Sequence, residues 1–130
     1  MKYLTIFLFL FCLNIAQAQD TFYANSFRVL LCKDLKANRW QLTHHGDTEK
    51  VFKISSRAVR VKTGNWTFVY RITETLHSTP DELLVLIKDD STISRSAFHY
   101  LKRIPEVRFL YKTNTGKIWL IQYFNKNPDA

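Results

Sequence analysis

The stretch Asn65-Trp66-Thr67-Phe68-Val69-Tyr70-Arg71-Ile72 carries the clearest structural pattern in the chain. Every second residue from Trp66 to Ile72 is large and apolar or aromatic, and Thr67, Val69 and Arg71 alternate with them. Side chains of a β-strand point to opposite faces in turn, so this pattern predicts a strand with one face turned to a core. The preceding residues Lys62-Thr63-Gly64-Asn65 indicate a tight hairpin turn.

Further short apolar runs lie on both sides of this strand, separated by polar turns. They cover residues 26–32, 39–43, 50–54, 57–62, 83–87, 107–112 and 117–124. Thr113-Asn114-Thr115-Gly116 is a second hairpin signal between the last two runs. No gap is long enough for several βαβ crossovers, so antiparallel connections should dominate. The sequence therefore predicts an all-β domain, a single small antiparallel barrel or sandwich of seven to eight strands.

The segment 92–104 is ambiguous between strand and helix. Its apolar residues recur at helical spacing, and Pro105 would end a helix. A strand from Ala97 to Leu101 would instead keep the regular rhythm of strands and turns along the chain. We expect the strand, and the alternative is an α+β fold with one helix over residues 92–104.

The N-terminus resembles an export signal. Lys2 precedes an almost purely apolar run from Leu4 to Ile15, and Ala16-Gln17-Ala18 places small residues where a signal peptidase cuts. We expect a signal peptide over residues 1–18, cleavage between Ala18 and Gln19, and a single β domain over residues 19–130. The protein would then be secreted or periplasmic. No later stretch is apolar for the roughly 20 residues that a membrane-spanning helix needs.

Composition places the chain among folded, basic domains. Of its 130 residues, 46% are hydrophobic and 15% aromatic, which excludes a disordered chain, and the formal net charge is +8. Loss of the leader removes Lys2 and no acidic residue, which leaves 18 basic against 11 acidic residues and a charge of +7. Such a charge favours anionic partners, a polymer or a surface. Only Cys32 remains, so the core must hold the fold without an internal disulfide.

The chain resembles the small exported β-barrel proteins of the lipocalin-like kind, and also short secreted bacterial β-domains. The residues that carry the resemblance are Asn38-Arg39-Trp40 near the start, followed by alternating strands through Phe124. The family pattern has glycine two residues before the tryptophan, where this chain has Asn38. The resemblance implies an up-and-down barrel and a binding function, and it transfers no ligand residue.

The polar residues offer weak candidates for chemistry. His44, His77 and His99 could act in acid–base catalysis, as in a secreted nuclease, if two of them met beside a cation. The cluster His44-His45-Gly46-Asp47 lacks the spacing of a metal site, and we interpret it as a hydrophilic turn. We therefore expect no metal and no cofactor, and catalytic residues remain unassigned.

Aromatic residues are the stronger functional signal. Many lie on the expected strands, where most should pack in the core. The run 117–124 is bulky on both faces, and 107–112 carries cations on one face. Aromatic rings interleaved with cations can bind a sugar, a base or a peptide. The candidate ligand-binding residues are Trp66, Tyr70, Arg108, Tyr111, Trp119 and Tyr123.

Three functions remain open at this point. The first is an exported, non-catalytic binding protein for an apolar small molecule or an anionic surface. The second is a secreted, nuclease-like hydrolase of an anionic polymer, and the third is a cell-envelope module that binds a partner through an exposed sheet edge. The residues favour binding over catalysis and leave an enzymatic function open. Asn65-Trp66-Thr67 also fits a glycosylation sequon if the source is eukaryotic.

Overall fold

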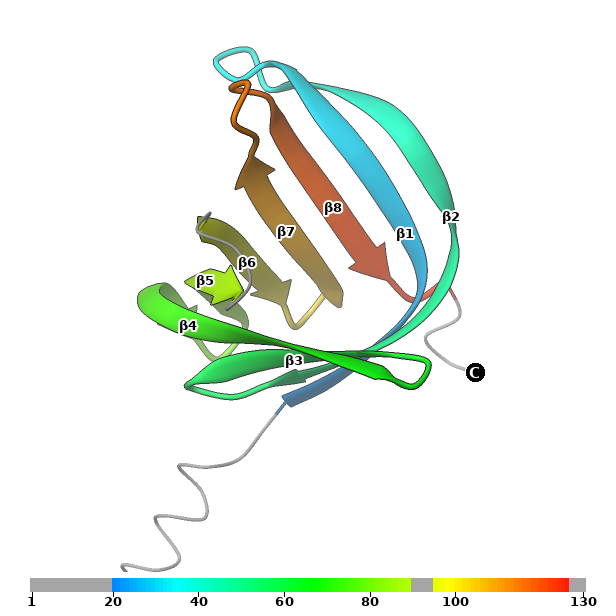
Figure 1. Ribbon diagram of the computed structural model, residues 1–130, viewed down its shortest axis with the longest axis vertical. Coiled ribbons are helices and arrows are strands. Elements are labelled where there is room, and N and C mark those ends of the chain that lie inside the picture. The colour runs from blue at the N-terminus through cyan, green and yellow to red at the C-terminus, as the bar shows by residue number, and fades with distance from the viewer. Residues whose placement is uncertain (1–19, 90–94, 127–130) are drawn as a thin grey trace, which may run out of the picture.

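Eight β-strands make up the computed structural model, which describes residues 20–89 and 95–126 (Figure 1). The strands are β1 (Asp20–Asp34), β2 (Arg39–Ile54), β3 (Ala58–Thr63), β4 (Trp66–Thr79), β5 (Glu82–Asp89), β6 (Arg95–Leu101), β7 (Glu106–Lys112) and β8 (Ile118–Phe124). Each strand pairs antiparallel with the next one along the chain. The all-β class and the strand count predicted from the alternation are therefore confirmed.

The sheet closes on itself through β1 and β8. Residues 26–31 of β1 pair antiparallel with residues 119–124 of β8, so the ends of the meander meet. Figure 1 shows β8 beside β1, although the two strands are far apart in sequence. Closure leaves one sheet rather than two packed sheets, and it selects the barrel over the sandwich.

The ambiguous segment is a strand where it is described. Residues 95–101 form β6, which pairs with β5 on one side and β7 on the other. The alternative of a helix over residues 92–104 is wrong for these residues, and no residue of the described chain is helical. Residues 92–94 lie outside the described part. Two neighbouring ladders satisfy the β6 backbone, and this tertiary pairing outweighs the helical spacing of its apolar side chains.

The core consists of the side chains that alternate inward along the strands. Phe52, Val59, Val85, Phe98 and Val107 are fully buried. The other buried apolar residues are Phe22, Ala24, Ile54, Val61, Ile87 and Tyr100. They form one cluster with contributions from six of the eight strands, and Tyr70 of β4 and Tyr123 of β8 pack against it. The barrel interior is therefore largely a packed core.

The expectation of a turn around Gly46 is wrong. The runs 39–43 and 50–54 belong to one strand, β2, and Gly46 lies within it, opposite Phe27 of β1. A Cβ atom on Gly46 would lie 3.3 Å from Phe27 Cε1, so glycine leaves room for this ring. Thr43 is an extra residue between the pairs Val29–His44 and Leu30–Leu42, and its hydroxyl donates to the Val29 carbonyl at 3.0 Å.

Three further expectations concern the leader, membrane-spanning helices and glycosylation. The expected signal peptide, residues 1–18, lies outside the described residues. Within residues 20–89 and 95–126, no helix is long and apolar enough to cross a membrane. Asn65 is exposed in the turn between β3 and β4, and its glycosylation stays a prediction.

Candidate ligand-binding cavity

A cavity of about 350 Å³ lies inside the barrel, above the packed core. Six of the eight strands line it. β2, β4, β7 and β8 each contribute two side chains, and β3 and β6 contribute one each. The lining residues are Lys50, Phe52, Val61, Phe68, Tyr70, Ser96, Phe109, Tyr111, Ile121 and Tyr123. A volume of this size lies at the lower end of the range for small-molecule sites, about 300–1,000 Å³.

Phe109 is the central ring of the aromatic floor. Its centroid lies 5.1 Å from that of Phe98 and 5.9 Å from those of Tyr70 and Tyr123. The ring of Phe52 lies 6.1 Å away, and it also contacts Tyr123 at 5.2 Å. These separations and tilted or edge-to-face geometries are favourable for aromatic pairs. The floor of the cavity is thus held in place by rings from β2, β4, β6, β7 and β8.

Among the described side chains that line the cavity, Lys50 alone carries a charge. It pairs with Ala24 of β1, whose side chain is buried, and it lies two residues from the buried Phe52, so it shares their inward face. Its Nζ atom is 5.2 Å from the centroid of the Tyr123 ring, in a cation–π contact. Burial lowers the pKa of Lys50 from its ordinary value of 10.5, because water no longer fully solvates the ammonium.

Three tyrosines add hydroxyl groups to the same cavity. Burial, together with the smaller effect of the neighbouring Tyr70 and Tyr111, raises the pKa of Tyr123 to about 12. The Tyr123 hydroxyl therefore keeps its proton at neutral pH and can donate a hydrogen bond. Ser96 contributes another hydroxyl from β6. The cavity combines an aromatic floor with one cation and several hydroxyl donors.

The six residues predicted from aromatic and cationic patterning divide into two groups. Tyr70, Tyr111 and Tyr123 line the cavity together. Neither tryptophan lines the cavity. Trp66 begins β4 and is 74% exposed, and Trp119 of β8 lies between Tyr111 of β7 and Leu31 of β1. Arg108 lies between the inward residues Val107 and Phe109, so it points to the outer face, where it forms an ion pair with Glu106. The structure brings three of the six residues together.

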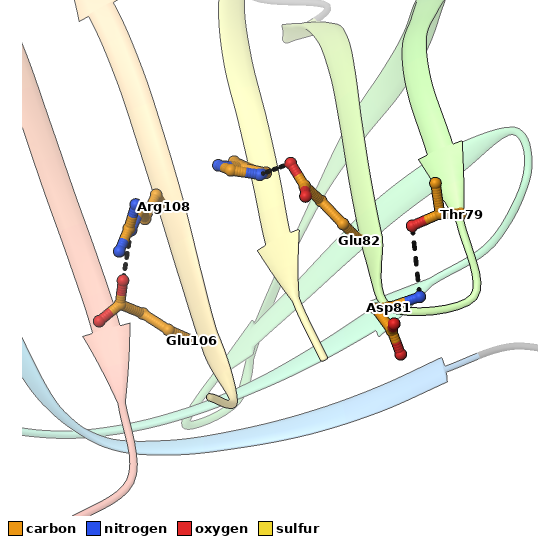
Figure 2. A network of polar contacts seen from close by, with 6 residues as sticks. Thr79, Asp81, Glu82, Glu106 and Arg108 are labelled. Atoms are coloured by element: carbon orange, nitrogen blue, oxygen red, sulfur yellow. Dashed lines mark hydrogen bonds and ion pairs between the residues drawn. The ribbon is translucent and has the colours of Figure 1, made fainter. Parts of the chain in front are cut away.

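The outer face carries His99 in a polar network that also contains Arg108 (Figure 2). His99 Nε2 lies 2.6 Å from Glu82 Oε1, and His99 sits opposite Arg108 across β6 and β7. Figure 2 shows the Arg108–Glu106 ion pair and, on the neighbouring strands, the contact of Glu82 with the imidazole of His99. The side chains of both pairs are partly buried, and each pair holds its own carboxylate in place on the outer face.

The three candidate catalytic histidines do not share a cleft. His44 is exposed on β2, and its Nδ1 lies 3.1 Å from Thr43 Oγ1. His77 on β4 is exposed and pairs with Leu84 of β5, which in turn pairs with His99 of β6. A whole strand therefore separates His77 from His99. Among the described residues, no group of three or more histidine, cysteine or acidic side chains is arranged to hold a metal ion.

Comparison of the chain with protein-family models, with curated proteins and with solved structures found no match. The functional argument therefore depends on the geometry of the cavity and on the chemistry of its lining residues.

Seven of the ten lining residues were not among the predicted binding residues, and Lys50 and Phe109 are the two of these that matter most for the site. Lys50 is the first of five basic residues between positions 50 and 62, and none of the five is among the predicted site residues. Alternation offered a signal, because Lys50, Phe52 and Ile54 are spaced by two and must share one face. Phe109 follows the same rule with Val107 and Tyr111. A lysine in register with two buried apolar residues is the pattern that would have identified the site.

The long strand β2 also provides a sheet edge. Its residues 51–54 pair with β3, whereas within the described chain the ladder of residues 39–50 is formed with β1 alone. The edge carries exposed charged or ionisable residues at His44, His45, Asp47 and Glu49, and it is bulged at Thr43. Charges and bulges are devices by which proteins prevent unwanted pairing at an edge.

Proposed function

We propose that this chain is an exported, non-catalytic binding protein that holds a small, mainly aromatic or apolar molecule inside the barrel. The cavity lined by Phe109, Tyr70 and Tyr123 is the observation that carries the proposal. Export is inferred from the signal-like sequence of residues 1–18 alone. The resemblance to lipocalin-like barrels agrees with a binding function but does not identify the ligand.

The geometry favours a ligand of modest size. A barrel of about eight strands has an interior just wide enough for side chains or for one small ligand. Here the core fills one part of that interior, and a cavity of about 350 Å³ lies next to the core. Apolar walls contribute to affinity because each Å² of apolar surface removed from water stabilises the complex by about 25 cal/mol. Ring-lined walls therefore suit a flat or aromatic molecule.

The hydrolase alternative has less support in the structure. It needs two of His44, His77 and His99 in one cleft with a cation, and these residues lie on β2, β4 and β6. His99 lies opposite Arg108, but it already bonds Glu82 on the outer face of the barrel. The sheet-edge alternative retains the free side of β2, but the bulge and the charges there oppose strand addition.

The proposal is tested by titrating the purified protein with phenylnaphthylamine, a neutral dye that fluoresces in apolar sites. We expect saturable binding with a stoichiometry of one, and a dissociation constant of about 1–10 μM for a ligand of this size. Absence of saturable binding would contradict the proposal.

A matched pair of β8 variants locates the dye. Ile121 lines the cavity, while its neighbour Leu120 points to the outer face. Ile121→Phe should narrow the cavity and weaken dye binding by about tenfold, whereas Leu120→Phe should leave it unchanged. Equal effects of the two substitutions would place the dye elsewhere and remove the support for a cavity ligand.

A further inference from the structure

We infer that the ligand of this cavity carries an anionic group, such as a carboxylate or sulfonate, which pairs with the Nζ atom of Lys50. This inference rests on the proposed function, because it names the chemical class of the molecule in the same cavity. The ligand would therefore be an amphipathic anion, with its ring or apolar body against Phe109 and its charge at Lys50.

The position of Lys50 within the barrel is the first argument. β2 places it in register with Ala24, and its side chain lines the cavity beside Phe52 and Tyr123. Its next basic neighbour on the strand, Lys53, is exposed and paired with Thr21 and Arg60 across the sheet. Lys50 is thus partly buried among rings, while a lysine three residues away is solvated in the ordinary manner.

The ionic environment of Lys50 is the second argument. Among the described residues, no carboxylate oxygen lies within 4.0 Å of its Nζ atom, and its cation–π contact with Tyr123 is its one recorded partner. A partly desolvated cation without a counter-ion is unfavourable, and an anion from a ligand would restore the lost interaction. The surface lysines Lys102 and Lys126, in contrast, each pair with an aspartate.

The remaining polar groups of the lining are the third argument. Tyr70, Tyr111, Tyr123 and Ser96 bring hydroxyl groups, and the lining side chains that the structure describes include no aspartate or glutamate. A cavity for a cation or an amine would be expected to contain carboxylates, because these are the groups that accept hydrogen bonds from an ammonium. A cavity that holds one lysine and several hydroxyl donors complements an oxyanion.

The lowered pKa of Lys50 agrees with this reading and adds a pH dependence. An anion binds the protonated amine, so its affinity should fall as pH rises through the pKa of Lys50. Because burial places that pKa below 10.5, the fall should begin at a lower pH than for an exposed lysine. A neutral ligand should show no such change.

The test compares two dyes that share one ring skeleton. Phenylnaphthylamine is neutral, and anilinonaphthalene sulfonate has the same rings with one sulfonate added. We expect Lys50→Met to weaken binding of the sulfonate by about tenfold or more, and to change binding of the neutral dye by less than about twofold. Lys50→Arg should restore much of the sulfonate affinity, because it keeps the positive charge.

Lys53→Met is the matched control, since it removes the same charge from the outer face of the same strand. It should leave both dyes unaffected, which separates a contact with Lys50 from a general effect of net charge. Thermal unfolding of each variant checks folding, and Lys50→Met should melt at a higher temperature because a desolvated charge is removed. Reduced binding together with increased stability marks a residue retained for binding.

The possible outcomes distinguish a failure of the anionic ligand class from a failure of the proposed binding function. If the neutral dye binds in the cavity and Lys50→Met leaves the ratio of the two affinities unchanged, the anionic ligand class is wrong and the binding function stands. If Lys53→Met has the same effect as Lys50→Met, the sulfonate responds to overall charge, and the inference is also overturned. If neither dye binds saturably, the proposed binding function itself fails.

Discussion

Replacing Phe52 with alanine is expected to lower the free energy of unfolding by about 4 kcal/mol. The Phe52 side chain is 0% exposed and contacts the rings of Phe22, Phe109 and Tyr123 at centroid distances between 5.2 and 6.1 Å. Its removal leaves a void where β1, β2, β7 and β8 meet. A domain of this size is stable by about 5–15 kcal/mol, so the variant should lose a large share of its stability. Urea denaturation followed by tryptophan fluorescence measures the change.

Phe68→Ala is the control for this prediction. Phe68 lies on β4 opposite Val61 of β3 and is 49% exposed, so its truncation removes far fewer contacts. We expect a loss of about 1 kcal/mol or less. If the two substitutions destabilise the protein equally, the packing of the barrel around Phe52 is not as described.

The second large effect is expected for Phe109→Ala. Phe109 joins the core to the cavity, because its ring contacts Phe52, Phe98, Tyr70 and Tyr123. Its truncation should destabilise the protein by about 3 kcal/mol and weaken binding of phenylnaphthylamine by about tenfold, since the aromatic floor would be lost. Urea denaturation and dye titration measure the two effects on one preparation.

Phe124→Ala separates these effects from a general loss of aromatic surface. Phe124 lies on the neighbouring strand β8, and its ring stacks with the guanidinium of Arg28 at 4.8 Å, away from the cavity lining. This variant should cost about 1 kcal/mol and leave dye affinity unchanged. A Phe109→Ala variant that binds the dye as tightly as the unmodified protein would contradict the assigned position of the cavity.

Strand content was predictable because local alternation decides it. In residues 66–72 the period of two predicted which side chains share a face, and Phe68 and Tyr70 do line the same cavity. The closure of the barrel was not predictable in this way. Its seam joins residues 26–31 to residues 119–124, and no local pattern specifies which distant strands will pair.

The length of β2 shows where local rules give a wrong result. His44-His45-Gly46-Asp47 is polar and contains glycine, which favours a turn. The partner strand changes this outcome, because β1 pairs along the whole segment and Phe27 needs the space that a side chain at Gly46 would fill. The glycine is required for packing between strands, and a sequence read one strand at a time cannot show that requirement.

Half of the predicted binding residues, Tyr70, Tyr111 and Tyr123, do line the cavity, and the other half do not. Aromatic content alone selected Trp66 and Trp119 together with the three tyrosines, but the position along the barrel decides which rings reach the cavity. Arg108 was selected for its charge, although alternation with Val107 and Phe109 places it outside. Lys50 was not among the predicted residues, although alternation with Phe52 places it inside. For these two residues, the face of the strand on which the side chain lies predicted a place in the cavity better than the charge did.

The most direct test of the central claim, that a small molecule binds inside this barrel, is a map of amide chemical shifts recorded during titration with phenylnaphthylamine. The account predicts that the largest shifts cluster at Lys50, Tyr70, Phe109, Tyr111 and Tyr123, the residues around the cavity. Shifts concentrated on the outer face, around Arg28, His45 and Phe124, would contradict it.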